Sequence, residues 1–214
     1  RTTDCHLCSR IIRLRDMSTH LKHHELEKST KAKPAICRNA NCGRTLEGVG
    51  RNGEIGAGSR MGQGPGNSVG VCSICFGPLY VSMHDPEGRA LRRRIERRYL
   101  SQLISGCGKA WCKNEYCKTA RAKAKASGGK GGGEALTAQM ALPIVKPLVD
   151  DIADHGKPCY FCVDEGSQRR RGMAEMLAAE GGYELEWCVA ALEAGGGRLD
   201  GARTWLGNWA PKKA

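Results

Sequence analysis

The stretch "RIERRYLSQLISGCGKAWCKNEYC", residues 94–117, decides the fold because it joins a helical pattern to a run of thiols. Apolar side chains recur here and just upstream at helical spacing and form one stripe: Leu91, Ile95, Leu100, Leu103 and Ile104. Three cysteines follow at even spacing: Cys107, Cys112 and Cys117. A tetrahedral metal site needs four ligands, so the fourth must lie elsewhere in the chain.

The composition favours several small modules over one large core. Of 214 residues only 5% are aromatic, whereas 29 are glycine and 12 are cysteine, so crosslinks or metals must support the fold. No apolar run of about 18 residues predicts a membrane span. No signal peptide opens the chain, and its start at Arg1 rather than Met indicates a fragment of a longer protein. We expect an intracellular protein, cytoplasmic or nuclear.

Zinc explains the cysteines better than disulfides do. They occur as close pairs, "CHLC", "CSIC" and "CYFC", and two thiolates on a tight turn can reach one Zn²⁺. Disulfides would require a secreted protein. We therefore predict small zinc-stabilised, α-rich modules with little β structure, holding about three Zn²⁺.

The first predicted site lies in "CHLCSRIIRLRDMSTHLKHH", residues 5–24. Cys5 and Cys8 share a turn, and His20 and His24 share one face of a helix because residues i and i+4 are neighbours. His23 remains an alternative fourth ligand. The stretch resembles C2H2 and ubiquitin-binding UBZ-type fingers, which implies nucleic acid as the partner in one case and ubiquitin in the other.

The second predicted site combines "CRNANC" with "CSIC". Its ligands would be Cys37, Cys42, Cys72 and Cys75, in a zinc-ribbon-like module. A glycine-rich segment, residues 48–70, separates the two pairs and predicts a flexible loop, which costs little closure entropy. A RING site using "CSIC" and His84 is disfavoured because the later cysteines lack the interleaved spacing.

The opening stretch resembles the amino-terminal zinc-binding module of HECT-type ubiquitin ligases, the AZUL domain, over about residues 92–162. The matching positions are Tyr99, Gln102, Leu103, Gly106, Cys107, Gly108, Cys112, Asn114, Glu115, Tyr116 and Cys117. The resemblance implies a second helix within 135–156 and a fourth ligand just after it, with Cys159 preferred and Cys162 the alternative.

This chain departs from the family in two ways. It has a glycine-rich insertion around 123–135, and it has Pro143 and Pro147, which predict a break or kink in the second helix.

The C-terminal segment resembles a UBA domain over about residues 172–209. Gly181-Gly182-Tyr183 stands at the family's first loop, Ala191-Leu192 and Trp205-Leu206 match later motifs, and Cys188 takes the place of an alanine. The resemblance implies three short helices and ubiquitin contacts through Gly182, Tyr183 and Leu206. Cys188 is then expected in the core and not as a ligand.

The predicted modules are residues 1–34 (finger), 35–84 (four-cysteine), 85–165 (AZUL-like) and 168–210 (UBA-like). Positive charge is concentrated in residues 1–125, which carry 24 Lys and Arg against 10 Asp and Glu. It peaks on one predicted helix, at Arg92, Arg93, Arg94, Arg97 and Arg98. Those arginines form either a solvated face or a surface for an acidic partner.

Two functions follow from these patterns. The first is a multi-zinc protein-interaction region of the ubiquitin–proteasome system, binding ubiquitin, a ubiquitin-like protein, the proteasome or a ligase-pathway protein. The alternative is a nucleic-acid or ribosome-binding zinc-finger protein that uses the basic first 125 residues. No catalytic constellation is evident, so a ligase's active domain would lie outside these residues.

Overall fold

A computed structural model describes residues 1–56, 67, 69–129 and 135–214. Parts of both glycine-rich segments, residues 57–66, 68 and 130–134, lie outside the described residues. The elements in chain order are β1 (Thr2–Asp4), β2 (Ile11–Arg13), η1 (Leu14–Asp16), α1 (Met17–Thr30), α2 (Ser73–Phe76), η2 (Gly77–Leu79), α3 (Arg89–Ile104), α4 (Lys118–Ala126), α5 (Ala138–His155), α6 (Glu165–Ala179), α7 (Leu185–Ala194) and α8 (Leu199–Trp209). The prediction of small α-rich modules with little β structure is confirmed. None of the described helices is both long and apolar enough to cross a bilayer.

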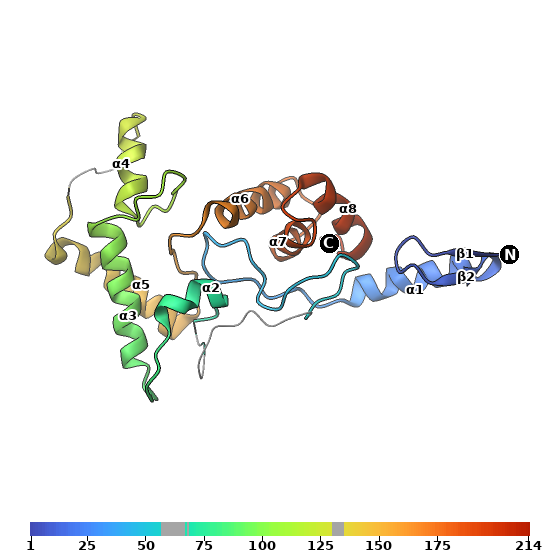
Figure 1. The fold of residues 1–214 in the computed structure, drawn as a ribbon, viewed down its shortest axis with the longest axis horizontal. Helices are drawn as coiled ribbons and strands as arrows, with labels where there is room; N and C mark the ends of the chain where they lie inside the picture. Colours follow the sequence, from blue (N-terminus) through green and yellow to red (C-terminus); the bar gives the residue numbers. More distant parts are fainter. Residues whose placement is uncertain (57–66, 68, 130–134) are drawn as a thin grey trace.

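The N-terminal finger has almost no apolar core. β1 and β2 form an antiparallel hairpin in which Thr3 faces Ile12, and α1 follows at one end of the molecule (Figure 1). Neither the strands nor α1 bury any side chain. Met17 and Leu21, the apolar side chains of α1 nearest the hairpin in sequence, are only half-buried. The fold of the finger therefore depends on its ligands.

The main core joins the four-cysteine segment to the AZUL-like helices. Helices α3 and α5 pack together, and α3 contributes Ile95, Tyr99 and Leu103. Phe76 and Leu79, from the preceding segment, belong to the same buried cluster. One core thus spans the predicted boundary at residue 84. Within the described part of 35–84, strand pairing is limited to isolated bridges.

Helix α5 runs through both of its prolines. The predicted break is wrong, because α5 is continuous from Ala138 to His155 with Pro143 and Pro147 inside it. Both prolines are exposed, whereas Ala141 and Val145 are fully buried on the face toward α3. The backbone groups that proline leaves unpaired therefore lie on the side that water can reach.

The C-terminal helices α6, α7 and α8 form a bundle with its own core. Trp187, Cys188 and Leu192 of α7 are at most 1% exposed and pack against Ala202 and Trp205 of α8. Asp164 caps α6 by accepting a hydrogen bond from the Ser167 backbone at 2.9 Å. In Figure 1 the bundle lies between the finger and the α3–α5 end of the molecule.

Candidate metal centres

Three clusters bring four ligand atoms each within 4.8 Å of one another. Cluster 1 is Cys5, Cys8, His20 and His24; cluster 2 is Cys37, Cys42, Cys72 and Cys75; cluster 3 is Cys107, Cys112, Cys117 and Cys162. All twelve cysteines of the chain are described and none is in a disulfide. Three clusters agree with the expected number of about three zinc ions.

The spacing of the ligand atoms fits tetrahedral zinc. A Zn–S distance of about 2.3 Å places two thiolates of a tetrahedron roughly 3.8 Å apart. The Sγ atoms of Cys42 and Cys72 are 3.8 Å apart in cluster 2, as are those of Cys112 and Cys162 in cluster 3. Each cluster could therefore hold one zinc ion without moving its ligands far.

Cluster 1 combines a thiolate turn with one face of α1. Cys8 Sγ lies 3.3 Å from His20 Nε2, and Cys5 Sγ lies 3.7 Å from His24 Nε2. His23, the alternative ligand, is exposed and outside the cluster. Burial is the main cause that lowers the pKa of His24, which favours the neutral, metal-binding imidazole.

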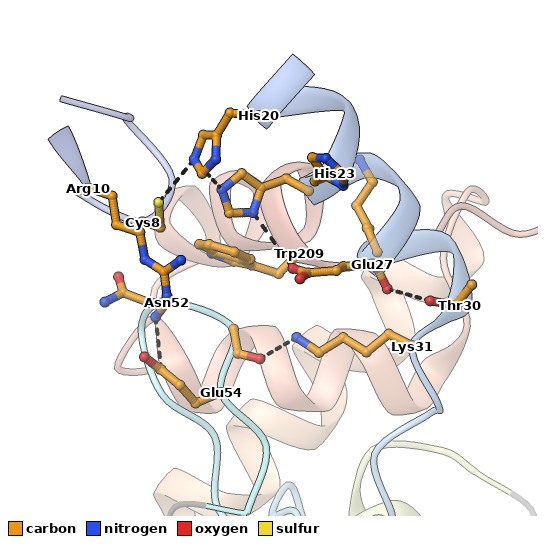
Figure 2. Close-up of a pocket in the computed structure, with 13 residues that line it drawn as sticks. Cys8, Arg10, His20, His23, Glu27, Thr30, Lys31, Asn52, Glu54 and Trp209 are labelled. Carbon is orange, nitrogen blue, oxygen red and sulfur yellow. Dashed lines mark hydrogen bonds and ion pairs between the residues drawn. The ribbon is translucent and has the colours of Figure 1, made fainter. Parts of the chain in front are cut away.

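A cleft of about 800 Å³ borders cluster 1, where the finger meets the bundle. Figure 2 shows Cys8 and His20 on one side of it and Asn52 and Glu54 on the other, with Trp209 between. The ring centroids of His24 and Trp209 are 6.1 Å apart. The finger thus contacts α8 directly through a ligand side chain.

Cluster 2 is fully buried, since each of its cysteines is at most 2% exposed. Four thiolates and one Zn²⁺ leave a net charge of −2, which needs hydrogen-bond donors around the sulfurs. Arg44 Nη1 and Ser167 Oγ donate to Cys42 Sγ at 3.7 and 3.5 Å, and the Cys72 backbone N–H donates to Cys37 Sγ at 3.2 Å. His84, part of the RING alternative, is exposed and lies outside this cluster.

The fourth residue of cluster 3 differs from the one preferred on the sequence. Cys162 lies in it, whereas the preferred Cys159 does not; Cys159 is 0% exposed in the main core, where its backbone pairs with Asn39. In extended chain, residues three apart point to opposite faces, so the two thiols cannot reach the same site.

The thiols of cluster 3 have different pKa values. Burial opposes ionisation of Cys117, but hydrogen bonds from the backbone of Cys107, Thr119 and Ala120 outweigh it and lower its pKa to about 7. The last two residues belong to the start of α4, where the helix N-terminus favours negative charge. Burial raises the pKa of Cys112 to about 11. Cys117 is therefore the thiol of this pair that ionises first.

Four donors to the ligand sulfurs were not predicted. Arg44 and Ser167 act on Cys42, Asn39 donates to Cys75, and Asn114 donates to Cys162. Nothing in the sequence links Ser167 to a cysteine 125 positions away. Asn39 and Asn114 could have been found from the sequence, because each is the third residue of a segment that begins and ends with cysteine.

The family match covers the segment that supplies three of the four residues of cluster 3. A match to the family model AZUL, described as an amino-terminal zinc-binding domain of ubiquitin ligase, covers residues 92–141 and includes Cys107, Cys112 and Cys117. Residues 92–141 are therefore similar to an AZUL-type zinc-binding module. This segment comprises most of α3, all of α4 and the start of α5. No curated protein and no solved structure matches this chain significantly.

The partner-binding residues predicted from the sequence are not all at the surface. Outside the AZUL module, Gly182 is exposed and Tyr183 half-buried, but Leu206 is 2% exposed within the bundle core. Leu206 therefore cannot present its side chain to a partner in this arrangement. Cys188 lies in the same core, away from the three clusters, as expected.

The predicted arginine surface divides in two. Arg98 lies 4.0 Å from the Phe161 ring centroid and donates to the Cys75 carbonyl at 2.6 Å, and Arg92 pairs with Asp150. The other three, Arg93, Arg94 and Arg97, are exposed. Of the five predicted arginines, only those three are exposed.

Proposed function

We propose that this chain is a zinc-organised protein-interaction region of the ubiquitin–proteasome system. The observation that carries the proposal is the AZUL match over residues 92–141, which contains three of the four ligands of cluster 3. Zinc holds the start of α4 and the Trp111 loop in place, and these segments offer a surface to a partner protein.

A cavity of about 740 Å³ lies on that surface. Its walls come from the Trp111 loop and α4, with Ala110, Ala120 and Ala124 beside the indole and charged residues around them. The Trp111 indole N–H donates to the Val163 carbonyl at 3.0 Å, which fixes the ring. An aromatic side chain held beside small apolar ones, with a charged rim, is typical of a protein-binding site.

The test uses the zinc-loaded chain against purified proteasome and against ubiquitin. Ala124→Glu places a charge in the cavity, and Ala122→Glu places the same charge on α4 outside it; both alanines are exposed. We expect the first variant to weaken binding to the proteasome or a ligase-pathway protein at least about tenfold and the second to leave it unchanged. Equal effects of the two variants, or failure of the unaltered chain to bind such partners, would reject the proposal.

The C-terminal bundle supplies a narrower hypothesis, that ubiquitin or a ubiquitin-like protein binds at the α6–α7 turn. Gly181 and Gly182 have φ values of 83° and 98° and form this exposed turn next to Tyr183. The Lys213 backbone N–H donates to the Gly182 carbonyl at 2.6 Å, so the C-terminal segment covers part of it. Tyr183→Ala should abolish ubiquitin binding, and because the contact is apolar the affinity should change little with salt.

Nucleic-acid or ribosome binding is the second candidate, favoured by the exposed Arg93, Arg94 and Arg97 of α3. No ion pair joins these three side chains to any residue that the structure describes. Contacts to phosphate release counterions, so such binding must weaken steeply as salt rises. Titration of RNA at about 50 and about 200 mM salt, with the triple substitution to Ser as the comparison, separates this function from the first.

A further inference from the structure

Two segments that belong to different metal clusters share one pattern. "CRNANC", residues 37–42, and "CKNEYC", residues 112–117, both read Cys, basic residue, Asn, two residues, Cys. The first segment supplies two thiols to cluster 2 and the second supplies two to cluster 3. We call them knuckle A (37–42) and knuckle B (112–117).

The asparagine plays the same part in both knuckles. Asn39 Oδ1 accepts from the Asn41 backbone at 3.2 Å, and Asn114 Oδ1 accepts from the Tyr116 backbone at 3.1 Å. Each Nδ2 donates to a ligand sulfur of its own cluster at 3.4 Å. Asn39 and Asn114 are 0% and 2% exposed, so both side-chain amides are shielded from water and form their hydrogen bonds within the protein.

Both asparagines also hold the same extended segment. Asn39 Nδ2 donates to the Phe161 carbonyl at 3.2 Å, and the Phe161 backbone N–H donates back to Asn39 Oδ1 at 3.0 Å. Asn114 Nδ2 donates to the Tyr160 carbonyl at 2.9 Å. Successive carbonyls of an extended chain point to opposite sides. Knuckles A and B therefore hydrogen-bond to opposite edges of residues 159–163.

That segment is itself part of a metal site. It supplies Cys162 to cluster 3, and it pairs with knuckle A through Ala40 N–H to the Cys159 carbonyl at 2.8 Å. Ordering knuckle A around a metal therefore also fixes the segment that must deliver Cys162. The same holds in reverse, since a metal at cluster 3 fixes the segment on which knuckle A closes.

We propose that Asn39 and Asn114 are positioning residues for zinc and that they couple clusters 2 and 3 through the shared segment 159–163. Zinc bound at either cluster raises the zinc affinity of the other cluster. The first ion orders segment 159–163, so the second ion binds without that loss of conformational entropy. Such coupling is reciprocal and amounts to roughly 5- to 150-fold in typical cases. Cluster 1 stands outside it, since its ligands all lie within residues 5–24.

The coupling is tested by removing one ligand and measuring the other clusters. Reduced, metal-free chain is titrated with Zn²⁺ against a competing chelator, and occupancy is counted by native mass spectrometry. Cys162→Ser should weaken zinc binding at cluster 2 about tenfold, and Cys75→Ser should weaken cluster 3 by the same factor. Cys5→Ser, which disables cluster 1, is the matched control and should leave both unchanged. Independent affinities, within about twofold in both reciprocal variants, would overturn the coupling.

The positioning role is tested with Asn114→Asp, which keeps the acceptor oxygen and removes both donors. We expect weaker Co²⁺ binding at cluster 3, at least about tenfold, and a shift of its thiolate-to-cobalt absorption band because the N–H···S bond is lost. Asn52→Asp makes the same change at an exposed position away from cluster 3 and should alter neither. An unchanged band and affinity in Asn114→Asp would overturn the role. If Asn114→Asp does not fold, Asn39→Asp applies the same two readouts to cluster 2.

Discussion

Cys159 and Cys162 are three positions apart but have different surroundings. Cys162 is one of the four residues of cluster 3, whereas Cys159 is enclosed in the main core. We expect Cys162→Ala to reduce the zinc content from three ions per chain to two. Cys159→Ala should keep three and lower the free energy of unfolding by about 1 kcal/mol, as for loss of a small buried side chain.

Native mass spectrometry and urea unfolding of the two variants decide between the thiols. Cys188→Ala is a further control, because Cys188 is equally buried but belongs to the bundle core. Loss of one zinc ion in Cys159→Ala, with full occupancy in Cys162→Ala, would reverse the ligand assignment.

Protons compete with zinc at cluster 3. Without metal, burial raises the pKa of Cys112 to about 11 and raises the pKa of Cys162 as well, so both thiols are protonated near neutral pH. Zinc must displace both protons, and its affinity therefore rises with pH. Competition with a chelator at about pH 6.5 and about pH 7.5 should show an increase of at least about 100-fold per pH unit at this cluster, because these two thiols alone release two protons. A tenfold or smaller increase would show that these thiols are already ionised.

At the residue scale, the spacing of cysteines and histidines along the chain predicted most of the residues in the three clusters. Cys5, Cys8, His20 and His24 are close in sequence, so helix and turn geometry alone predict that they meet. Cys159 and Cys162 could not be separated in this way, because the choice depends on which face of an extended segment points toward knuckle B. That face is set by Asn114 and by contacts with α3, such as the Cys162 N–H to Gln102 Oε1 bond at 3.0 Å.

Among the elements, α5 shows how burial overrides local preference. Four of its side chains on one face are buried in the main core: Ala141, Val145, Val149 and Ile152. Proline in a helix interior costs about 3 kcal/mol, yet Pro143 and Pro147 are tolerated because both are exposed on the other side. The proline rule alone predicted a break or kink, whereas the burial of this face explains why α5 continues through both prolines.

The prolines should still lower the stability of the protein. Pro147→Ala restores a backbone donor within α5, and we expect it to raise the free energy of unfolding by about 1–2 kcal/mol after the gain in unfolded-state entropy is subtracted. Urea unfolding with all clusters loaded measures the change, and Pro211→Ala, outside the helices, is the control. A loss of stability in Pro147→Ala would show that α5 requires the local geometry of proline.

On the scale of the whole molecule, the modules are less independent than the sequence indicated. The Gly43 backbone N–H donates to Ser167 Oγ at 3.0 Å, and Arg44 pairs with Asp164 at 2.8 Å, which joins cluster 2 to the start of α6. The Trp205 indole N–H donates to the Gly50 carbonyl at 3.0 Å. Composition shifts and glycine-rich segments predicted separate units, but contacts between residues so far apart in the chain leave no periodic pattern.

Ser167 provides the most direct link between the bundle and a metal site. Its hydroxyl donates to Cys42 Sγ at 3.5 Å, accepts from Gly43, and is 0% exposed. Removing zinc from cluster 2 should therefore loosen α6 and, through their shared core, α7. We expect chelation to speed hydrogen exchange in residues 185–194, measured by mass spectrometry, although none of these residues belongs to a metal cluster.

Ser167→Ala should weaken this dependence of the bundle on zinc. The substitution leaves the Gly43 N–H without its partner and removes a donor to the thiolate, so the unfolding free energy should fall by about 1–2 kcal/mol. Exchange in residues 185–194 should then be faster before chelation and change less after it, since the link is already broken. Ser101→Ala, at an exposed site on α3, should leave both quantities unchanged. If chelation accelerates exchange in Ser167→Ala as much as in the unaltered chain, the bundle senses zinc by a route other than Ser167.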